Sequence, residues 1–261
     1  VTMRSKHENR TDQLIKYAII GLVLIAAGFA IWTFLQKSLV TSKIMNQRVT
    51  YTEQMPKNIP ATETIHAFDD GNPFANNNQA KTAIGQVAIP KVGLVTNVFA
   101  GLTNANLSFG AVSLFPDRPI ENHNVVLIGH NMGVRHLHFG ALQNVSIGDK
   151  VYLRYLGHSY QYQVRQKSTI KETQIDRVAD TMTSKLTLVT CSAATRTPNR
   201  ILVSADLVKE LPARQAQMKV AGVLKEQKQQ ICHDLWWRNW LPIIVICLLA
   251  LIIIMLVMRF L

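Results

Sequence analysis

Two uninterrupted apolar segments lie near the ends of the chain, and shorter apolar runs fill the region between them. The first segment is Tyr17–Leu35 and the second is Leu241–Met258, and neither contains a charged residue. A helix needs roughly 20 apolar residues to cross the hydrocarbon layer of a membrane, and core helices of soluble domains are seldom apolar over such a length. The pattern therefore predicts transmembrane helices at 17–35 and 241–258.

The residues that flank these segments indicate an orientation. Segment 1–16 carries four basic residues, and no small-x-small cleavage pattern follows Leu35, which favours an uncleaved anchor over a signal peptide. The positive flank places 1–16 in the cytoplasm, and the second crossing returns the tail 259–261 there. Before the second segment stand three aromatic residues typical of a membrane interface: Trp236, Trp237 and Trp240. The region between the spans is expected outside the cell membrane.

Short apolar or alternating runs, separated by turns, occupy 82–210. Regularly spaced strands of this kind predict one all-β domain, a barrel or a sandwich, with short helices at 104–109 and 136–143. The segment 36–81 is expected to be a connector, helical over 36–54 and then rich in turn residues, and 211–240 a juxtamembrane helical linker. The expected strands are Gly85–Ile89, Leu94–Phe99, Asn124–Gly129, Lys150–Tyr155, Tyr160–Lys171, Leu186–Cys191 and Arg200–Leu207.

Charge and cysteine content narrow the function. The net charge of the 261 residues is +12, which suits a domain facing anionic headgroups or wall polymers. The chain has no Gly-rich phosphate loop and no zinc-finger spacing, so nucleic acid is not an expected partner. There are 3 cysteines, and one of them, Cys247, lies inside the second span. So few cysteines, one of them in a membrane span, do not form a disulfide scaffold. Catalysis is then one reason for a thiol in an exported domain.

Three chemically complementary side chains are predicted at strand ends: Cys191, His130 and Arg200. An imidazole activates a thiol and returns the proton to a leaving amine. A guanidinium stabilises the oxyanion of a tetrahedral intermediate. These are the parts of a cysteine acyl-transfer site, although a buried structural cysteine also occurs at a strand end. Arg196 competes for the arginine role, and Arg200 is favoured because it opens an apolar strand.

The local sequence motifs favour the first of these interpretations, a cysteine acyl-transfer site. Residues 187–191 read Thr-Leu-Val-Thr-Cys, Arg200 is the second residue of Asn-Arg-Ile-Leu-Val, and His130 ends Ile-Gly-His. Upstream stand Val-Ala-Ile-Pro-Lys-Val-Gly from residue 87 and Val-Phe-Ala-Gly-Leu-Thr-Asn-Ala-Asn-Leu from residue 98. Over roughly 84–208 the chain resembles the sortases, the membrane-anchored cysteine transpeptidases of Gram-positive bacteria.

This resemblance implies a fold, an activity and residue roles. The fold is a closed eight-stranded sortase-type β-barrel. Cys191 would attack the threonine carbonyl of a Leu-Pro-x-Thr-Gly sorting signal in a surface-protein precursor. His130 would act as general acid and base, Arg200 would orient the substrate and stabilise the oxyanion, and Thr190 would contact the substrate. The acyl group would pass from a thioacyl-enzyme to a cell-wall precursor amine.

The subclass stays open. The early strands resemble the housekeeping class A enzymes, whereas a C-terminal span is more usual in class C enzymes, which join pilins through a lysine. Class C enzymes also carry a lid with Asp-Pro-aromatic, and the connector contains Asn72-Pro73-Phe74 near Asp69 and Asp70. An ordinary Asn-Pro turn is the alternative interpretation of that sequence.

No cofactor or metal is predicted. Zinc needs a converging set of ligands. The histidines at 123, 136, 138 and 158 show no such set, and Arg135 stands beside them with no obvious carboxylate partner. Calcium activates some class A sortases, but the acidic residues Asp117, Glu121, Glu172 and Asp176 form no recognisable loop. Two rival functions remain: a non-catalytic, membrane-tethered β-barrel that binds wall components, and an enzyme that hydrolyses the signal without transfer.

Overall fold

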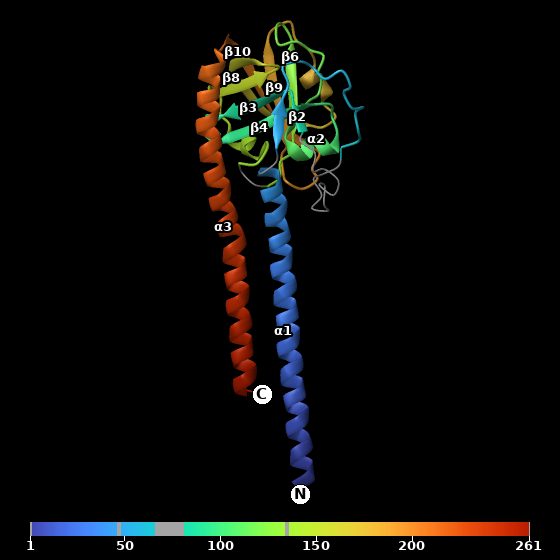
Figure 1. The fold of residues 1–261 in the computed structure, drawn as a ribbon. Helices are drawn as coiled ribbons and strands as arrows, with labels where there is room; N and C mark the ends of the chain where they lie inside the picture. The colour runs from blue at the N-terminus through green and yellow to red at the C-terminus, as the bar shows by residue number, and fades with distance from the viewer. Residues whose placement is uncertain (1, 46–47, 66–80, 134–135, 261) are drawn as a thin grey trace. The chain divides into compact units, whose positions relative to one another are not determined.

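A computed structural model describes residues 2–45, 48–65, 81–133 and 136–260 of the chain. Its contacts divide the chain into two units, one made of residues 1–43 and 233–261 and the other of residues 44–232. The candidate lid Asn72-Pro73-Phe74, with Asp69 and Asp70, lies outside the described residues. The fold that positions the predicted site belongs to the second unit (Figure 1).

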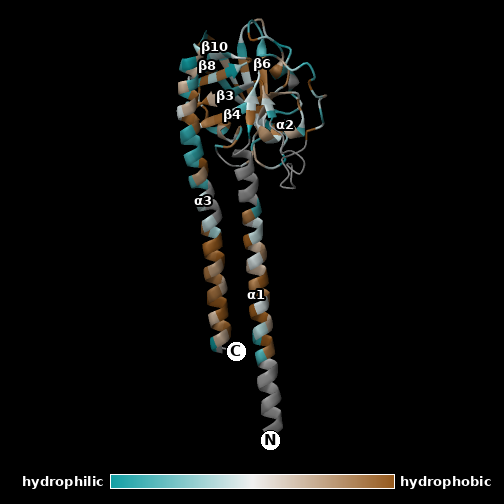
Figure 2. Cartoon of the chain, in the orientation of Figure 1, coloured by the Kyte–Doolittle hydropathy of each residue, from teal (hydrophilic) through white to brown (hydrophobic). Residues whose placement is uncertain are grey.

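Two long helices carry the apolar segments. Helix α1 is Thr2–Met45 and helix α3 is Ala213–Phe260. Within them, Gln13–Thr33 and Trp240–Arg259 are long and apolar enough to cross a membrane. Figure 2 shows these stretches as the most continuous apolar parts of the two helices. Their exposed leucine, isoleucine and tryptophan side chains suit a lipid environment rather than water.

Eight strands close into a mixed barrel, which confirms the all-β expectation. Around the barrel the order is β10-β8-β7-β3-β4-β5-β6-β9, and β9 pairs again with β10. The pairs β4–β5 and β6–β9 are parallel and the others are antiparallel. The strands are β3 Gly85–Ile89, β4 Leu94–Ala100, β5 Ala111–Ser113, β6 Asn124–Gly129, β7 Lys150–Tyr155, β8 His158–Lys171, β9 Lys185–Cys191 and β10 Asn199–Glu210.

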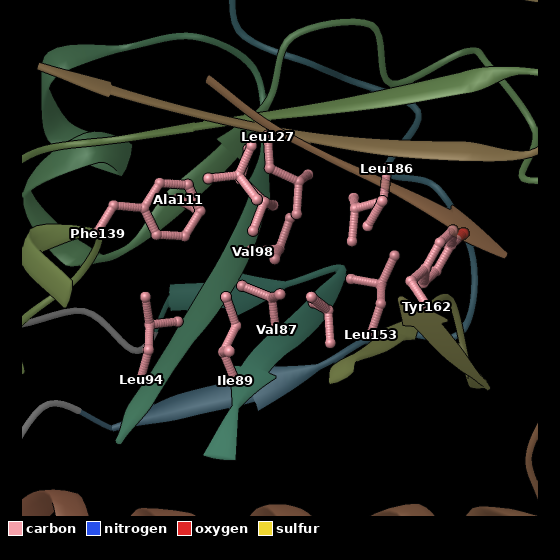
Figure 3. Packing of buried hydrophobic residues seen from close by; sticks show 14 of the residues in the cluster. Val87, Ile89, Leu94, Val98, Ala111, Leu127, Phe139, Leu153, Tyr162 and Leu186 are labelled. Carbon is pink, nitrogen blue, oxygen red and sulfur yellow. The ribbon is translucent and has the colours of Figure 1, made fainter. Parts of the chain in front are cut away.

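Alternate residues of these strands fill the interior. On β8, Tyr160, Tyr162 and Val164 belong to the hydrophobic core, and the residues that alternate with them, Gln161 and Gln163, do not, as a strand period of two requires. Figure 3 shows the side chains that meet inside the barrel, among them Val87, Leu127 and Leu186 from three different strands. A closed barrel has no unpaired sheet edge and its interior is filled by side chains, so a cavity forms most readily at the strand ends and the loops beside them.

Short elements connect the strands. The predicted helix 104–109 is confirmed as α2 Asn104–Phe109, whose N-terminus is capped by the Thr103 side chain accepting from the Asn106 N–H. The 3-10 helices are η1 Pro90–Val92, η2 Gly140–Asn144 and η3 Ile175–Val178. The predicted helix 136–143 is wrong, because its first half is a loop and only η2 is helical. His138 has a φ of 48°, which an α-helix does not allow, and its ring is hydrogen-bonded to Thr96 and Ser108 instead.

The connector is more structured than its composition indicates. The predicted helix 36–54 is wrong from Arg48 onward, because β1 Val49–Tyr51 pairs in parallel with β2 Lys81–Ala83. Downstream, Met55 and Ile59 pack against the barrel core. Burial of these apolar side chains fixes a segment that the turn residues alone would leave open.

Candidate active site

Strand register brings the three predicted chemical groups to one end of the barrel. β9 lies between β6 and β10, and its last residue, Cys191, is paired with Arg200 on β10. On the other side the parallel register pairs Val189 with Ile128, so its continuation sets His130 beside Cys191. The thiol therefore has the imidazole residue on one neighbouring strand and the guanidinium residue on the other. Arg196 lies in the exposed loop that joins β9 to β10.

The backbone around the thiol is held by side-chain hydrogen bonds. Cys191 is half-buried and forms no disulfide, and its carbonyl oxygen accepts from Asn131 Nδ2 at 3.1 Å. Thr190 is 1% exposed, and its Oγ1 donates to the Gly129 carbonyl oxygen at 2.8 Å. Both bonds tie the end of β9 to the end of β6, so they fix the thiol relative to the histidine. Thr190 still lines the cavity, but its hydroxyl proton is engaged in this framework.

His130 is held in its neutral form. Its side chain is 9% exposed, and burial lowers its pKa to about 4 because the charged imidazolium is poorly solvated there. Near neutral pH the imidazole therefore has a nitrogen lone pair that can accept a proton from a thiol. A proton acceptor beside a half-buried thiol is what nucleophilic catalysis by cysteine requires.

Arg200 is engaged by an acidic residue that the sequence did not link to it. Its Nη2 donates to Glu172 Oε2 at 2.5 Å, and its Nη1 donates to the carbonyl oxygens of Thr197 and Asn199. The Arg200 side chain is 24% exposed and the Glu172 side chain 53%. Glu172 follows β8, the other strand beside β10, so a ligand that uses this guanidinium has to compete with a carboxylate.

A cavity of about 750 Å³ opens at these groups. Cys191, His130 and Arg200 line its polar part. Thr64 and Ile65 of the connector line it as well, and Glu63 Oε2 fixes them by accepting from the Asn104 N–H at 2.9 Å. The sequence offered no signal for these two residues. The apolar wall includes side chains from three strands, from the loop after β5 and from η3: Ile128, Ile170, Val189, Leu114 and Val178.

The residues that were considered as metal ligands, and for which no site was predicted, are engaged in other contacts. Among the described residues, no three histidine, cysteine, aspartate or glutamate side chains are grouped as a metal site. His136 and His138 bond to the main chain, at Val92 O and Ser108 O, while His123 and His158 pair with carboxylates at Asp180 and Glu210. Of the four acidic residues considered for calcium, Glu172 binds Arg200.

Two buried histidines predict acid sensitivity of the fold. Burial lowers the pKa of His138, like that of His130, to about 4 from an ordinary 6.5. Between pH 6.5 and pH 4 the unfolded chain therefore binds more protons than the folded chain, and stability falls as pH falls through this window. The expected loss at pH 5 is on the order of 2–4 kcal/mol. Urea unfolding at several pH values, monitored through amide exchange of the barrel strands, measures this loss of stability.

Substitution of single histidines tests which residues cause this acid sensitivity. His138→Gln is expected to remove about half of the loss, whereas His158→Gln, at an exposed position, should leave it unchanged. Stability that stays level between pH 6.5 and pH 5 in the parent chain would contradict the burial argument.

Comparisons with known proteins agree with this arrangement. Residues 87–208 match the family profile "Sortase domain". Sortase A of Listeria monocytogenes is 34% identical over 135 residues, which span 52% of this chain and 61% of that protein. YwpE of Bacillus subtilis is 33% identical over 92 residues, 35% of this chain and 90% of that protein.

A solved structure is similar over the barrel. The crystal structure of Listeria monocytogenes sortase A superposes with a TM-score of 0.51 at 32% identity and covers 53% of this chain and 97% of that one. The region 87–208 that matches the family profile contains β4 to β9 and most of β3 and β10, with the cysteine, histidine and arginine positions. The chain therefore belongs to the sortase family of cysteine transpeptidases.

Proposed function

We propose that this chain is a membrane-anchored transpeptidase that cleaves a Leu-Pro-x-Thr-Gly sorting signal between threonine and glycine and transfers the acyl group to a cell-wall precursor amine. One observation carries the proposal: Cys191 is flanked by His130 and Arg200 on its two neighbouring strands, at the edge of one cavity. A non-catalytic barrel has no need for this grouping.

The reaction proceeds in two acyl transfers. In the first, the Cys191 sulfur attacks the threonine carbonyl carbon while the thiol proton passes to neutral His130. The imidazolium then gives this proton to the departing glycine amine, which leaves a thioester on Cys191. In the second, an incoming amine attacks the thioester and gives a proton to His130, which passes it to the departing Cys191 sulfur and so restores the thiol and the neutral imidazole. Arg200 stabilises the oxyanion in both steps once it exchanges its bond with Glu172 for the substrate.

The cavity has room and chemistry for such a peptide. Its wall of Leu114, Ile170 and Val178 suits the leucine and proline side chains of the signal, because burial of apolar groups is favourable. The polar end with Cys191 then receives the threonine carbonyl. The precursor proteins that carry such signals are the proposed partners.

The two apolar helices support a place in the cell membrane. We infer that both termini are cytoplasmic and that the barrel faces the outside, from the basic residues of 1–16 and the aromatic residues before the second span. Anchoring by two transmembrane helices would restrict the substrates to proteins that reach the outer surface of the membrane.

An amine-acceptor assay tests the proposal. The full chain in detergent micelles is mixed with a fluorogenic Leu-Pro-x-Thr-Gly peptide and one of three amines: oligoglycine, an alanine cross-bridge mimic or a pilin lysine peptide. The expected product joins the peptide at threonine to a cross-bridge amine. The C-terminal span favours a pilin-joining enzyme as second candidate, and selective transfer to the lysine peptide would establish it. Water as the only acceptor would show a hydrolase, and the absence of cleavage would contradict both candidates.

Glu172→Gln is expected to raise kcat/KM for the peptide roughly 2- to 5-fold. The reason is that an exposed ion pair contributes up to about 1 kcal/mol, and the neutral amide no longer competes for the Arg200 guanidinium. Steady-state kinetics at low salt measure the change. The matched control is Asp206→Asn, which removes the Arg165–Asp206 pair between the same two strands and should have no effect. A fall in kcat for Glu172→Gln would instead mean that Glu172 orients Arg200 for the reaction.

A further inference from the structure

The first turns of helix α3 are part of the barrel unit and not a free linker. Ala216 and Val223 of α3 are buried against Ala88, Val95 and Tyr152 on the outer face of the barrel. Lys219 Nζ donates to the Tyr152 hydroxyl at 3.1 Å, and Ile231, about three turns further along, is 3% exposed. This packing extends to within nine residues of Trp240, where the apolar part of the same helix begins.

One polar side chain of α3 enters the interface. Gln227 is 5% exposed, and its Nε2 donates to two main-chain oxygens, those of Val95 at 2.9 Å and His136 at 2.5 Å. On β4, strand β5 pairs only with Val98–Ala100, so within the described residues Val95 has no strand partner on that side. The Gln227 amide supplies a donor there, and an unpaired buried carbonyl would be destabilising.

The second oxygen belongs to the loop that begins with His130. This loop folds back on itself: Asn131 forms an isolated β-bridge with His138, and the Phe139 N–H donates to the His130 carbonyl oxygen at 3.1 Å. Phe139 is fully buried and points into the core, as Figure 3 shows. The returning arm of the loop therefore contacts the backbone of His130 directly, and Gln227 holds that arm at His136.

We propose that Gln227 is a positioning residue for His130, through which the membrane-proximal part of α3 holds the histidine loop in its catalytic geometry. This inference rests on the proposed function for its kinetic consequence. A proton-transfer group has to lie within hydrogen-bond reach of the thiol, and a displacement of about 1 Å costs up to a hundredfold in rate. Helix α3, which continues into the second apolar segment, therefore helps to position the catalytic histidine.

The test replaces the amide without changing its size. The variant is Gln227→Met in the full chain, studied in detergent micelles. Methionine has about the length and volume of glutamine but donates no hydrogen bond. With the Leu-Pro-x-Thr-Gly peptide we expect kcat to fall about ten- to a hundredfold and KM to stay within about twofold, because the peptide does not contact this residue. Hydrogen–deuterium exchange of the Phe139 amide is expected to become at least roughly tenfold faster. Gln229→Met, at an exposed position of the same helix, is the control.

The outcomes separate this inference from the proposed function. A folded Gln227→Met chain with the parent kcat, or with unchanged exchange at Phe139, would overturn the positioning role, as would an equal loss in Gln229→Met. If Gln227→Met does not fold, Gln227→Asn replaces it; the shorter amide cannot reach both oxygens, so an intermediate loss of kcat is expected. If the parent chain cleaves no peptide, the proposed function fails, and the exchange comparison still decides whether Gln227 holds the loop.

Discussion

Replacement of Cys191 by alanine is expected to reduce peptide cleavage to the uncatalysed background, a loss of about 10⁴-fold or more in kcat. Without the sulfur no thioester forms, so both acyl transfers are lost together, whereas the backbone bonds from Asn131 and Thr190 are untouched. Cleavage of the fluorogenic peptide by the full chain measures this loss. The effect should be confined to chemistry, with peptide binding and the unfolding temperature close to those of the parent.

The matched control for Cys191→Ala is Cys232→Ala. Cys232 is an exposed thiol on α3, outside the cavity, and its removal should leave cleavage unchanged. Cleavage that persists in Cys191→Ala and disappears in Cys232→Ala would contradict the assignment of the nucleophile. Loss in both variants would point to a disturbed fold, which the unfolding temperature would reveal.

Replacement of His130 by alanine is expected to lower kcat/KM roughly 10³-fold, the range found for a general acid and base. Cleavage should keep its dependence on Cys191, because the nucleophile remains in place but loses its proton acceptor. Added imidazole should restore part of the rate, since the removed ring leaves a space beside the thiol. Rates measured with and without imidazole, at constant pH, give both quantities.

His158→Ala is the control for the histidine. This residue is exposed and pairs with Glu210 at the β7–β8 turn, so its loss should not change the rate. Parent-like activity in His130→Ala would remove the histidine from the proposed mechanism. A loss that imidazole does not reverse, accompanied by a lower unfolding temperature, would mean that His130 serves the fold rather than proton transfer.

The strands could be predicted because their apolar residues alternate with a period of two. The bounds of β3, β6 and β7 agree with the sequence prediction, and the helix at 104–109 agrees because Thr103 is a preferred cap. Strand β5 was missed because its three residues carry too little pattern. The helix expected at 136–143 failed because tertiary hydrogen bonds hold His138 at a positive φ, which local propensity does not reveal.

The site was predictable in its chemical groups and not in its supports. Cys191, His130 and Arg200 stand in short motifs at strand ends, where a thiol, an imidazole and a guanidinium are informative by themselves. Their partners are set by tertiary structure: Glu172 lies 28 residues from Arg200, and Gln227 lies 91 residues from His136. Ordinary polar residues at such separations carry no local signal, so the competing carboxylate and the holding amide emerge only from the folded chain.

The central claim is a covalent acyl-enzyme on Cys191, and mass spectrometry of the digested chain tests it most directly. The full chain is incubated with the Leu-Pro-x-Thr-Gly peptide without added amine, quenched in acid and digested. We expect a mass increase equal to the acyl group of the peptide up to threonine, located on Cys191, which disappears when oligoglycine is added before quenching and is absent in Cys191→Ala. Peptide cleavage with no adduct on Cys191, or an adduct on another residue, would contradict it.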